Sequence, residues 1–168
     1  MKKYTAILVT LLCLLILTGC RGDSALDQMG DTLGLSVAEG TVKSGVDTHS
    51  GTQGDGCSFT EVRFSDDSLQ QEIEQQDDWQ TIPLSDTLTA LVYGTGSRDD
   101  SIGPYLTDKD GNCLFPEITH GYYWFKDRQA ESRDGEDSPE LLERASLNVT
   151  MAMYDIDTRT LYYCELDT

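Results

Sequence analysis

The sequence predicts an α+β fold, a mainly antiparallel sheet of about four to six strands with two or three short helices on one face. Extended segments rich in aromatic and β-branched residues recur along the chain. Between them lie short segments that begin with a polar cap and carry apolar residues three or four positions apart. The last two extended segments flank a turn at 155–159, and we expect this C-terminal hairpin to be central to the sheet.

Two short helices and one further helical turn are expected from capping residues. The polar cluster at 65–68 predicts the start of a helix over 67–77 with one narrow apolar seam. Ser85 caps a second helix, which we expect to end at Gly94. A proline after a capping serine predicts one helical turn at 139–144.

The strands are expected where aromatic and β-branched residues concentrate. Residues 57–64 alternate between apolar and polar side chains, and residues 120–126 are strongly aromatic. Residues 105–115 form two short arms around a turn. Residues 146–154 and 161–166 form the C-terminal hairpin, which is the firmest structural prediction.

Composition limits the classes of protein to which the chain can belong. It has 168 residues and a formal charge of −18, from 30 acidic and 12 basic side chains. Its 38% of hydrophobic residues suffice for one modest core, which excludes a multidomain enzyme and a polytopic membrane protein. We expect no nucleic-acid partner, because phosphate backbones select cationic surfaces. So large a negative charge either keeps a surface protein soluble or attracts a cationic partner.

The first twenty residues have the parts of an export signal. Lys2 and Lys3 form a basic start, residues 5–17 are almost entirely apolar, and Leu17-Thr18-Gly19-Cys20 follows. This ending resembles the lipobox of bacterial lipoproteins. The resemblance implies that residues 1–19 are a lipoprotein signal peptide and that Cys20 becomes a lipidated N-terminus. Two acyl chains on one cysteine anchor a protein stably to a membrane. The alternative is an uncleaved membrane anchor.

The resemblance also implies a location and a domain plan. A lipidated Cys20 places the mature protein at the cell membrane, on its extracytoplasmic face. Residues 20–45 are rich in Gly, Ser, Thr and Asp and predict a flexible tether. Within it, Leu26 and Met29 favour at most one or two weak helical turns, against which Gly30 argues. Residues 46–168 predict a single globular α+β domain, in which no motif points to a characterised family.

Three cysteines remain in the predicted mature domain: Cys57, Cys113 and Cys164. Their number is odd, so at most one intramolecular disulfide can form. Their spacing matches no zinc site. We expect small buried strand residues, with one bridge between Cys57 and Cys164 on neighbouring strands as the alternative.

Asp47, His49 and Asp55 form the first candidate metal site. Side chains at positions i and i+2 of an extended segment point the same way, so Asp47 and His49 can share a divalent ion or a proton. The surrounding glycines allow close approach of a ligand. The alternative is a solvated loop. We expect no other cofactor.

Asp108, Asp110 and Asn112 resemble the opening of an EF-hand calcium loop. The resemblance fails at the sixth position, where Cys113 replaces glycine, and at the twelfth, where Thr119 replaces glutamate. The same residues are good turn formers, so we favour a turn between two short arms.

The aromatic strand is the candidate binding surface. Tyr122, Tyr123 and Trp124 follow one another, so alternation gives the strand an aromatic residue on both faces. An exposed Tyr and Trp surface can stack on sugar rings or anchor a protein. The alternative is that both faces are covered.

These observations favour a non-catalytic binding or accessory module for a protein or cell-wall component. One rival is a small metal-dependent hydrolase that uses Asp47, His49 and Asp55, with His120 as a further group. The other is an acidic inhibitor of a cationic lytic enzyme. An enzyme needs these groups in one cleft, whereas a binding module needs an exposed apolar patch.

Overall fold

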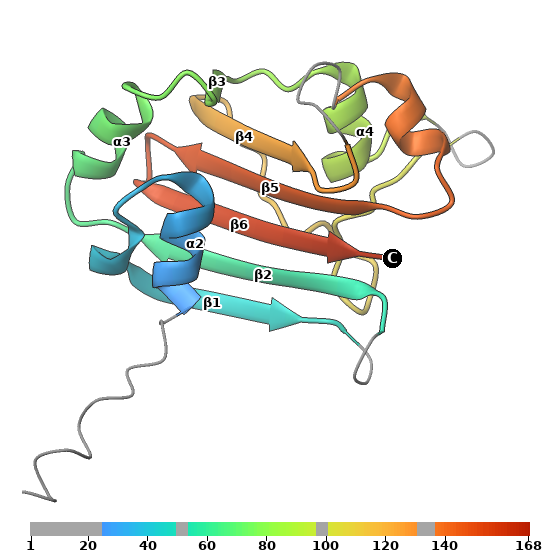
Figure 1. Ribbon diagram of the computed structural model, residues 1–168, viewed down its shortest axis with the longest axis horizontal. Coiled ribbons are helices and arrows are strands. Elements are labelled where there is room, and N and C mark those ends of the chain that lie inside the picture. The colour runs from blue at the N-terminus through green and yellow to red at the C-terminus, as the bar shows by residue number, and fades with distance from the viewer. Residues whose placement is uncertain (1–24, 50–53, 97–100, 131–136) are drawn as a thin grey trace, which may run out of the picture.

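A computed structural model describes residues 25–49, 54–96, 101–130 and 137–168 (Figure 1). Its centre is a six-stranded antiparallel sheet in the order β1-β2-β6-β5-β4-β3. The strand bounds are β1 (Thr41–Asp47), β2 (Gly56–Arg63), β3 (Gln80–Thr81), β4 (Gly121–Asp127), β5 (Asn148–Asp155) and β6 (Thr160–Asp167). The predicted α+β class with a mainly antiparallel sheet is confirmed.

The C-terminal hairpin occupies the middle of the sheet, as predicted. β5 pairs with β6 along their whole length, and each then pairs with another long strand on its other side. Nearly every residue of β5 is buried, because both of its faces are covered and both of its edges are paired. This explains why β5 is apolar on both faces, whereas a strand with one solvated face alternates.

Alternation along the strands gives the sheet two apolar faces. The first, here called the α4 face, carries Phe59, Met151, Met153 and Phe125. The second, here called the α2 face, carries Val62, Ala152, Leu161 and Trp124, among others. The two sets come from the same strands at alternating positions, as strand geometry requires.

The α4 face is covered by α4 (Asp86–Tyr93), η3 (Pro139–Glu143) and the segment 104–118. Leu88, Leu91 and Val92 of α4 are all at most 1% exposed. Tyr105 donates its backbone N–H to the Leu91 carbonyl at 2.9 Å, which fastens the segment to the helix. The predicted boundaries of α4 are confirmed.

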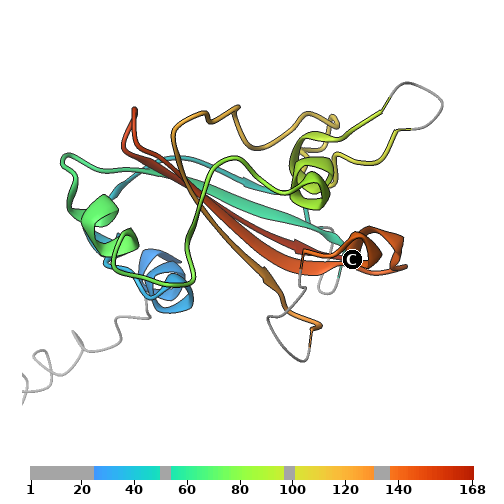
Figure 2. The ribbon, with the colours of Figure 1, turned by 90° about the horizontal axis from the view of Figure 1, so that it is seen from above.

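The α2 face is covered by α2 (Ala25–Leu33), η2 (Val37–Glu39) and α3 (Ser68–Ile73). Figure 2 shows α2 and α3 on one side of the sheet and α4 on the other. The prediction that all helices lie on one face was therefore wrong. A strand such as β5, apolar on both faces, requires a cover on each side.

The predicted tether over 20–45 also differs from the structure, in which residues 25–47 are part of the fold. Met29 and Leu33 are at most 4% exposed, on the inner side of α2. The glycines that argue against a helix have other uses here. A Cβ atom on Gly30 would lie 2.6 Å from the Leu35 carbonyl oxygen, and Gly34 has φ +67 where the chain turns back.

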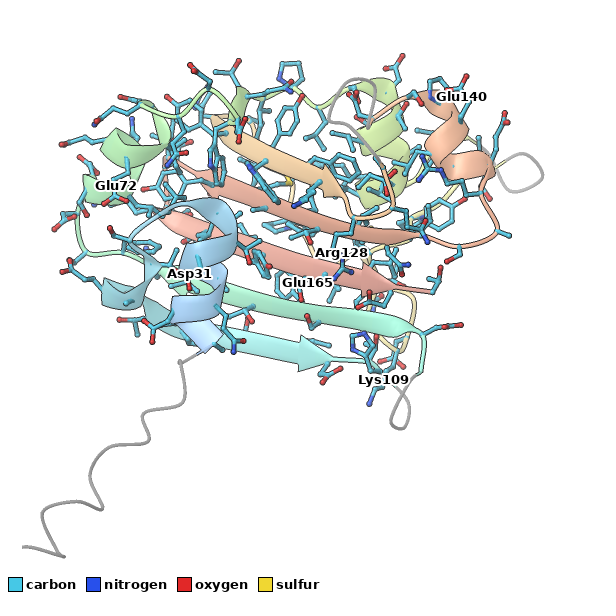
Figure 3. All side chains as sticks on the ribbon, in the orientation of Figure 1. Asp31, Glu72, Lys109, Arg128, Glu140 and Glu165 are labelled. Atoms are coloured by element: carbon cyan, nitrogen blue, oxygen red, sulfur yellow. The ribbon has the colours of Figure 1, made fainter. Side chains whose placement is uncertain are left out.

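The α2 face is covered over only part of its length. Beyond α2, towards the end of β6, it carries the exposed Lys126, the partly exposed Glu165 and the exposed Arg128. Figure 3 shows Glu165 and Arg128 on this open part of the sheet. Among the helices of the described ranges, none has the length and apolar character to cross a bilayer.

Candidate binding groove

A groove of about 590 Å³ lies between α4, η3 and the segment 101–105. Its volume falls in the range of small-molecule and cofactor pockets in proteins. The apolar part of its lining comes from Ala90, Ile102, Tyr105, Pro139 and Leu142. Its polar lining comes from Asp86, Thr87, Thr89, Thr95, Ser101 and Glu143.

The α4 wall exists because both ends of this helix are fixed. Ser85 Oγ accepts a hydrogen bond from the Leu88 backbone N–H at 3.3 Å, which caps the first turn. Gly94, with φ +75, ends the helix. The helix turns its apolar side to the sheet, which leaves Asp86 and Thr89 at the groove.

The segment 101–105 forms the second wall of the groove, and its backbone lies close to that of α4. A Cβ atom on Gly103 would lie 2.1 Å from the Ala90 carbonyl oxygen, so only glycine fits there. Gly103 also has φ +69. Thr95 and Ile102 exchange backbone hydrogen bonds of 2.8 and 2.9 Å, which fixes the edge of the wall.

Ile102 is the most unusual residue of the groove. It is 47% exposed, and only one other large hydrophobic side chain in the described ranges is as exposed, Val42 on β1 at 51%. Exposing a large aliphatic side chain to water is unfavourable, so a partner that covers Ile102 gains free energy. The carboxylates of Asp86 and Glu143 lie at the same groove. The surface therefore combines apolar lining with negative charge.

Two of the three residues predicted as a metal site are in contact. The Asp47 carboxylate accepts hydrogen bonds from the His49 backbone N–H at 3.0 Å and from Nδ1 at 2.7 Å. The pKa of Asp47 is lowered by these two bonds, the backbone bond first. Asp55 is exposed, and its backbone lies just before β2.

The other imidazole nitrogen of His49 faces a residue that the sequence analysis missed. Nε2 lies 3.5 Å from Asp167 Oδ2, and Asp167 in turn pairs with Arg128 at 2.6 Å. Asp47, and then Asp167, raise the pKa of His49, because both carboxylates stabilise the imidazolium. This arrangement is an ion-pair chain that joins the end of β1 to the end of β6. Asp167 lies 118 positions from His49 (167 minus 49), so no local pattern could have revealed it.

His120, the further group of the enzyme hypothesis, lies elsewhere. Its Nδ1 is 3.2 Å from Asp157 Oδ2, in the turn between β5 and β6. His49 contacts Asp167 at the opposite end of β6, and the length of that strand is roughly 24 Å. The two histidines are therefore not brought together. In the described ranges, no group of three or more His, Cys, Asp or Glu side chains is arranged to hold a metal ion.

The Asp108 segment forms a turn. Asp108 Oδ1 accepts the backbone N–H groups of Asp110 and Asn112, each at 2.9 Å, and Asn112 Nδ2 donates to Asp108 Oδ2 at 2.9 Å. Thr107 and Cys113 form an antiparallel bridge on either side. The Asp108 carboxylate therefore organises the turn that the residue types predicted.

The aromatic strand lies in both cores. Tyr123 and Trp124 are each 5% exposed, on opposite faces of β4. Tyr122 is partly exposed, and its hydroxyl donates to Glu74 at 2.8 Å. An exposed stacking surface made of Tyr122, Tyr123 and Trp124 is not what the structure shows, because helices cover both sides of this strand.

No family model matches the chain, and no curated protein or solved structure matches it either.

Proposed function

We propose that the protein is a lipid-anchored, extracytoplasmic binding module whose groove holds an apolar, positively charged segment of a protein partner. The observation that carries this proposal is the exposed Ile102 beside Asp86 and Glu143 in a groove of about 590 Å³. Apolar side chains of the partner cover Ile102 and Leu142, and its Lys or Arg side chains pair with the two carboxylates.

The charge of the whole chain supports a cationic partner. A formal charge of −18 attracts positive segments over distances of about a Debye length, which is ~8 Å at physiological salt. This attraction speeds encounter, whereas burial of Ile102 sets how long the complex lasts.

The short distance between Cys20 and α2 supports an orientation. Five residue steps separate Cys20 from Ala25, a reach of at most about 18 Å, so an acylated Cys20 holds the α2 end close to the bilayer. α4 and η3 lie at the opposite end of the sheet from α2 in both Figure 1 and Figure 2. The groove then faces away from the membrane, towards partners in the medium or wall.

The experiment is a fluorescence titration of the protein with short peptides of defined charge and hydrophobicity. We expect peptides that alternate Lys or Arg with Leu or Phe to bind at least tenfold more tightly than glutamate-containing peptides of the same apolar content. Ile102→Ser should weaken that binding about tenfold, which corresponds to ~1.4 kcal/mol. Val42→Ser is the matched control, because Val42 is equally exposed but lies on β1.

Equal weakening by both substitutions, or equal binding of basic and acidic peptides, contradicts the proposal that the groove binds a basic, apolar segment.

The lipid anchor at Cys20 is tested separately. Labelled fatty acid should be incorporated into the chain expressed in bacteria and should be absent from the Cys20→Ser variant. Label in that variant contradicts the anchor and leaves the groove untouched.

A further inference from the structure

Cys57 and Cys164 form a buried pair on the α4 face that the proposed function does not use. Cys57 is opposite Leu166 and Phe59 is opposite Cys164 in the β2–β6 ladder, so the two cysteines are diagonal neighbours on one face. They are 3% and 0% exposed. Each thiol is the largest cause of the shift in the other's pKa, so the two side chains interact across this diagonal. Both are in the reduced state in this structure.

The two thiols have unequal acidity. The hydrogen bond from Cys164, helped by the Thr107 backbone, lowers the pKa of Cys57 to about 7. The pKa of Cys164 is raised, because its proton is held by Cys57 and because it is buried. Thiolate is the reactive form of cysteine, so Cys57 is the nucleophile of the pair.

Cys57 is buried at the margin of the core, close to the start of β2. It is the second residue of β2, and its Sγ donates to the Tyr105 carbonyl oxygen at 3.9 Å. The segment 104–118 therefore covers it. Tyr105 also lines the groove, so the thiol pair lies beneath one of the groove walls. Cys113, the third cysteine, is exposed in the turn of that same segment.

We propose that Cys57 and Cys164 are an oxidative modification site that forms a cross-strand disulfide when the protein meets an oxidised thiol compound. The Cys57 thiolate attacks one sulfur of the compound's disulfide, forms a mixed disulfide and expels one thiolate. Cys164 then loses its proton, attacks the Cys57 sulfur and expels the second thiolate. The two expelled thiolates take up the two protons, so two cysteines are oxidised and one external disulfide is reduced to two thiols.

The ladder geometry permits this bond after a small adjustment. Diagonal residues of an antiparallel pair have Cα atoms about 7–8 Å apart, whereas disulfides join Cα atoms up to about 6.8 Å apart. The two Cα atoms must therefore come roughly an ångström closer, by a local shift of β2 along β6, because the strands are already about 4.7–4.9 Å apart across the ladder. The bond closes a loop of about 100 residues, for which chain-entropy arguments predict a large stabilisation.

The test uses the mature natural chain, purified with reductant and divided in two. One half is kept reduced, and the other is treated with oxidised glutathione. Both halves are then denatured, alkylated with N-ethylmaleimide and mapped by mass spectrometry. We expect alkylation of Cys57, Cys113 and Cys164 in the reduced half. In the oxidised half we expect alkylation or glutathione at Cys113 alone and one linked peptide containing Cys57 and Cys164.

Thermal unfolding provides the second readout. The oxidised chain should unfold roughly 5–15 °C above the reduced chain. Cys164→Ala should abolish this difference, and Cys113→Ser should preserve it. Free Cys57 and Cys164 after oxidation, or a linked peptide that contains Cys113, overturns the proposal. The peptide map is made on the natural chain, so the result does not depend on how well the variants fold.

Discussion

The α4 face and the α2 face are built from the same strands, yet they are covered in different ways. Two pieces of chain, residues 25–39 and 68–79, cover the α2 face. Three separate segments cover the α4 face: α4, residues 104–118 and η3. The groove with the exposed Ile102 lies where these segments meet.

The α2 cover has a hollow of its own, of about 580 Å³, but it is different in kind. Its lining comes entirely from residues 26–39, the two short helices and the turn between them. In the proposed orientation it lies at the membrane end. The two hollows have similar volumes, but only the groove beside α4 is formed where separate segments of the chain meet. Volume alone therefore does not distinguish the candidate binding surface.

The largest effect should follow removal of the α2 cover. A chain that starts at residue 41 exposes Val62, Leu161 and Trp124, which α2 and its neighbours bury. We expect it to lose its cooperative thermal transition, because a large apolar surface returns to water. A chain that starts at residue 25 should keep the transition. Equal melting of the two chains would show that residues 25–40 are a tether after all.

Single core truncations should show that both faces contribute equally. Leu91→Ala on the α4 face and Leu33→Ala on the α2 face each remove a side chain at most 3% exposed. Each should lower the free energy of unfolding by about 3 kcal/mol in urea titrations. Val42→Ala, at a half-exposed position, should change it by less than about 0.5 kcal/mol. If Leu33→Ala has a negligible effect while Leu91→Ala is destabilising, the two faces do not contribute equally to stability.

The next largest effect on stability should follow the loss of an ion pair beside the α4 cover. The Asp127 side chain is fully buried and pairs with Arg144, just after η3. Arg144→Leu leaves that carboxylate without its cation and should cost about 2–3 kcal/mol in the same titrations. Asp127→Asn combined with Arg144→Leu should recover part of the loss, because no buried charge remains. If the double variant is as unstable as the single one, packing of Arg144 is the dominant contribution.

The smallest effect on stability should follow the removal of His49 from the ion-pair chain. Its pKa is raised in the folded protein, so the stability it contributes is fully present below the unfolded pKa of about 6.5. That contribution disappears as the pH rises through the folded pKa. His49→Gln should therefore reduce stability at pH 5.5 by no more than about 1 kcal/mol and have less effect at pH 8.5. Larger destabilisation at pH 8.5 than at pH 5.5 contradicts the ion-pair chain.

The elements that were predicted correctly carry their own signals. Ser85 and Gly94 fix both ends of α4 through local backbone chemistry. The β5–β6 hairpin combines a turn at 155–159 with two apolar strands. α2 was missed because its stability comes from contacts of Met29 and Leu33 with the sheet, not from helix propensity.

The candidate site was harder to predict for the same reason. Asp47 and His49 are two positions apart and were found, whereas Asp167 is distant in sequence. The groove is lined by residues between positions 86 and 143, and none of them stands out from its neighbours in the sequence. The best sequence signal was the pair of capping serines at 85 and 138, since each begins an element that lines the groove.

The central place of β6 has a consequence for how the chain is made. Phe59 pairs with Cys164, 105 positions later (164 minus 59), so β2 is synthesised well before its inner partner exists. Until then the β1–β2 hairpin presents an open edge with Phe59 and Val62 beside it. Unpaired edges of this kind recruit other chains, and pairings so distant in sequence form slowly. The dense negative charge of the chain opposes such encounters, because newly emerged copies repel one another while they wait for β6.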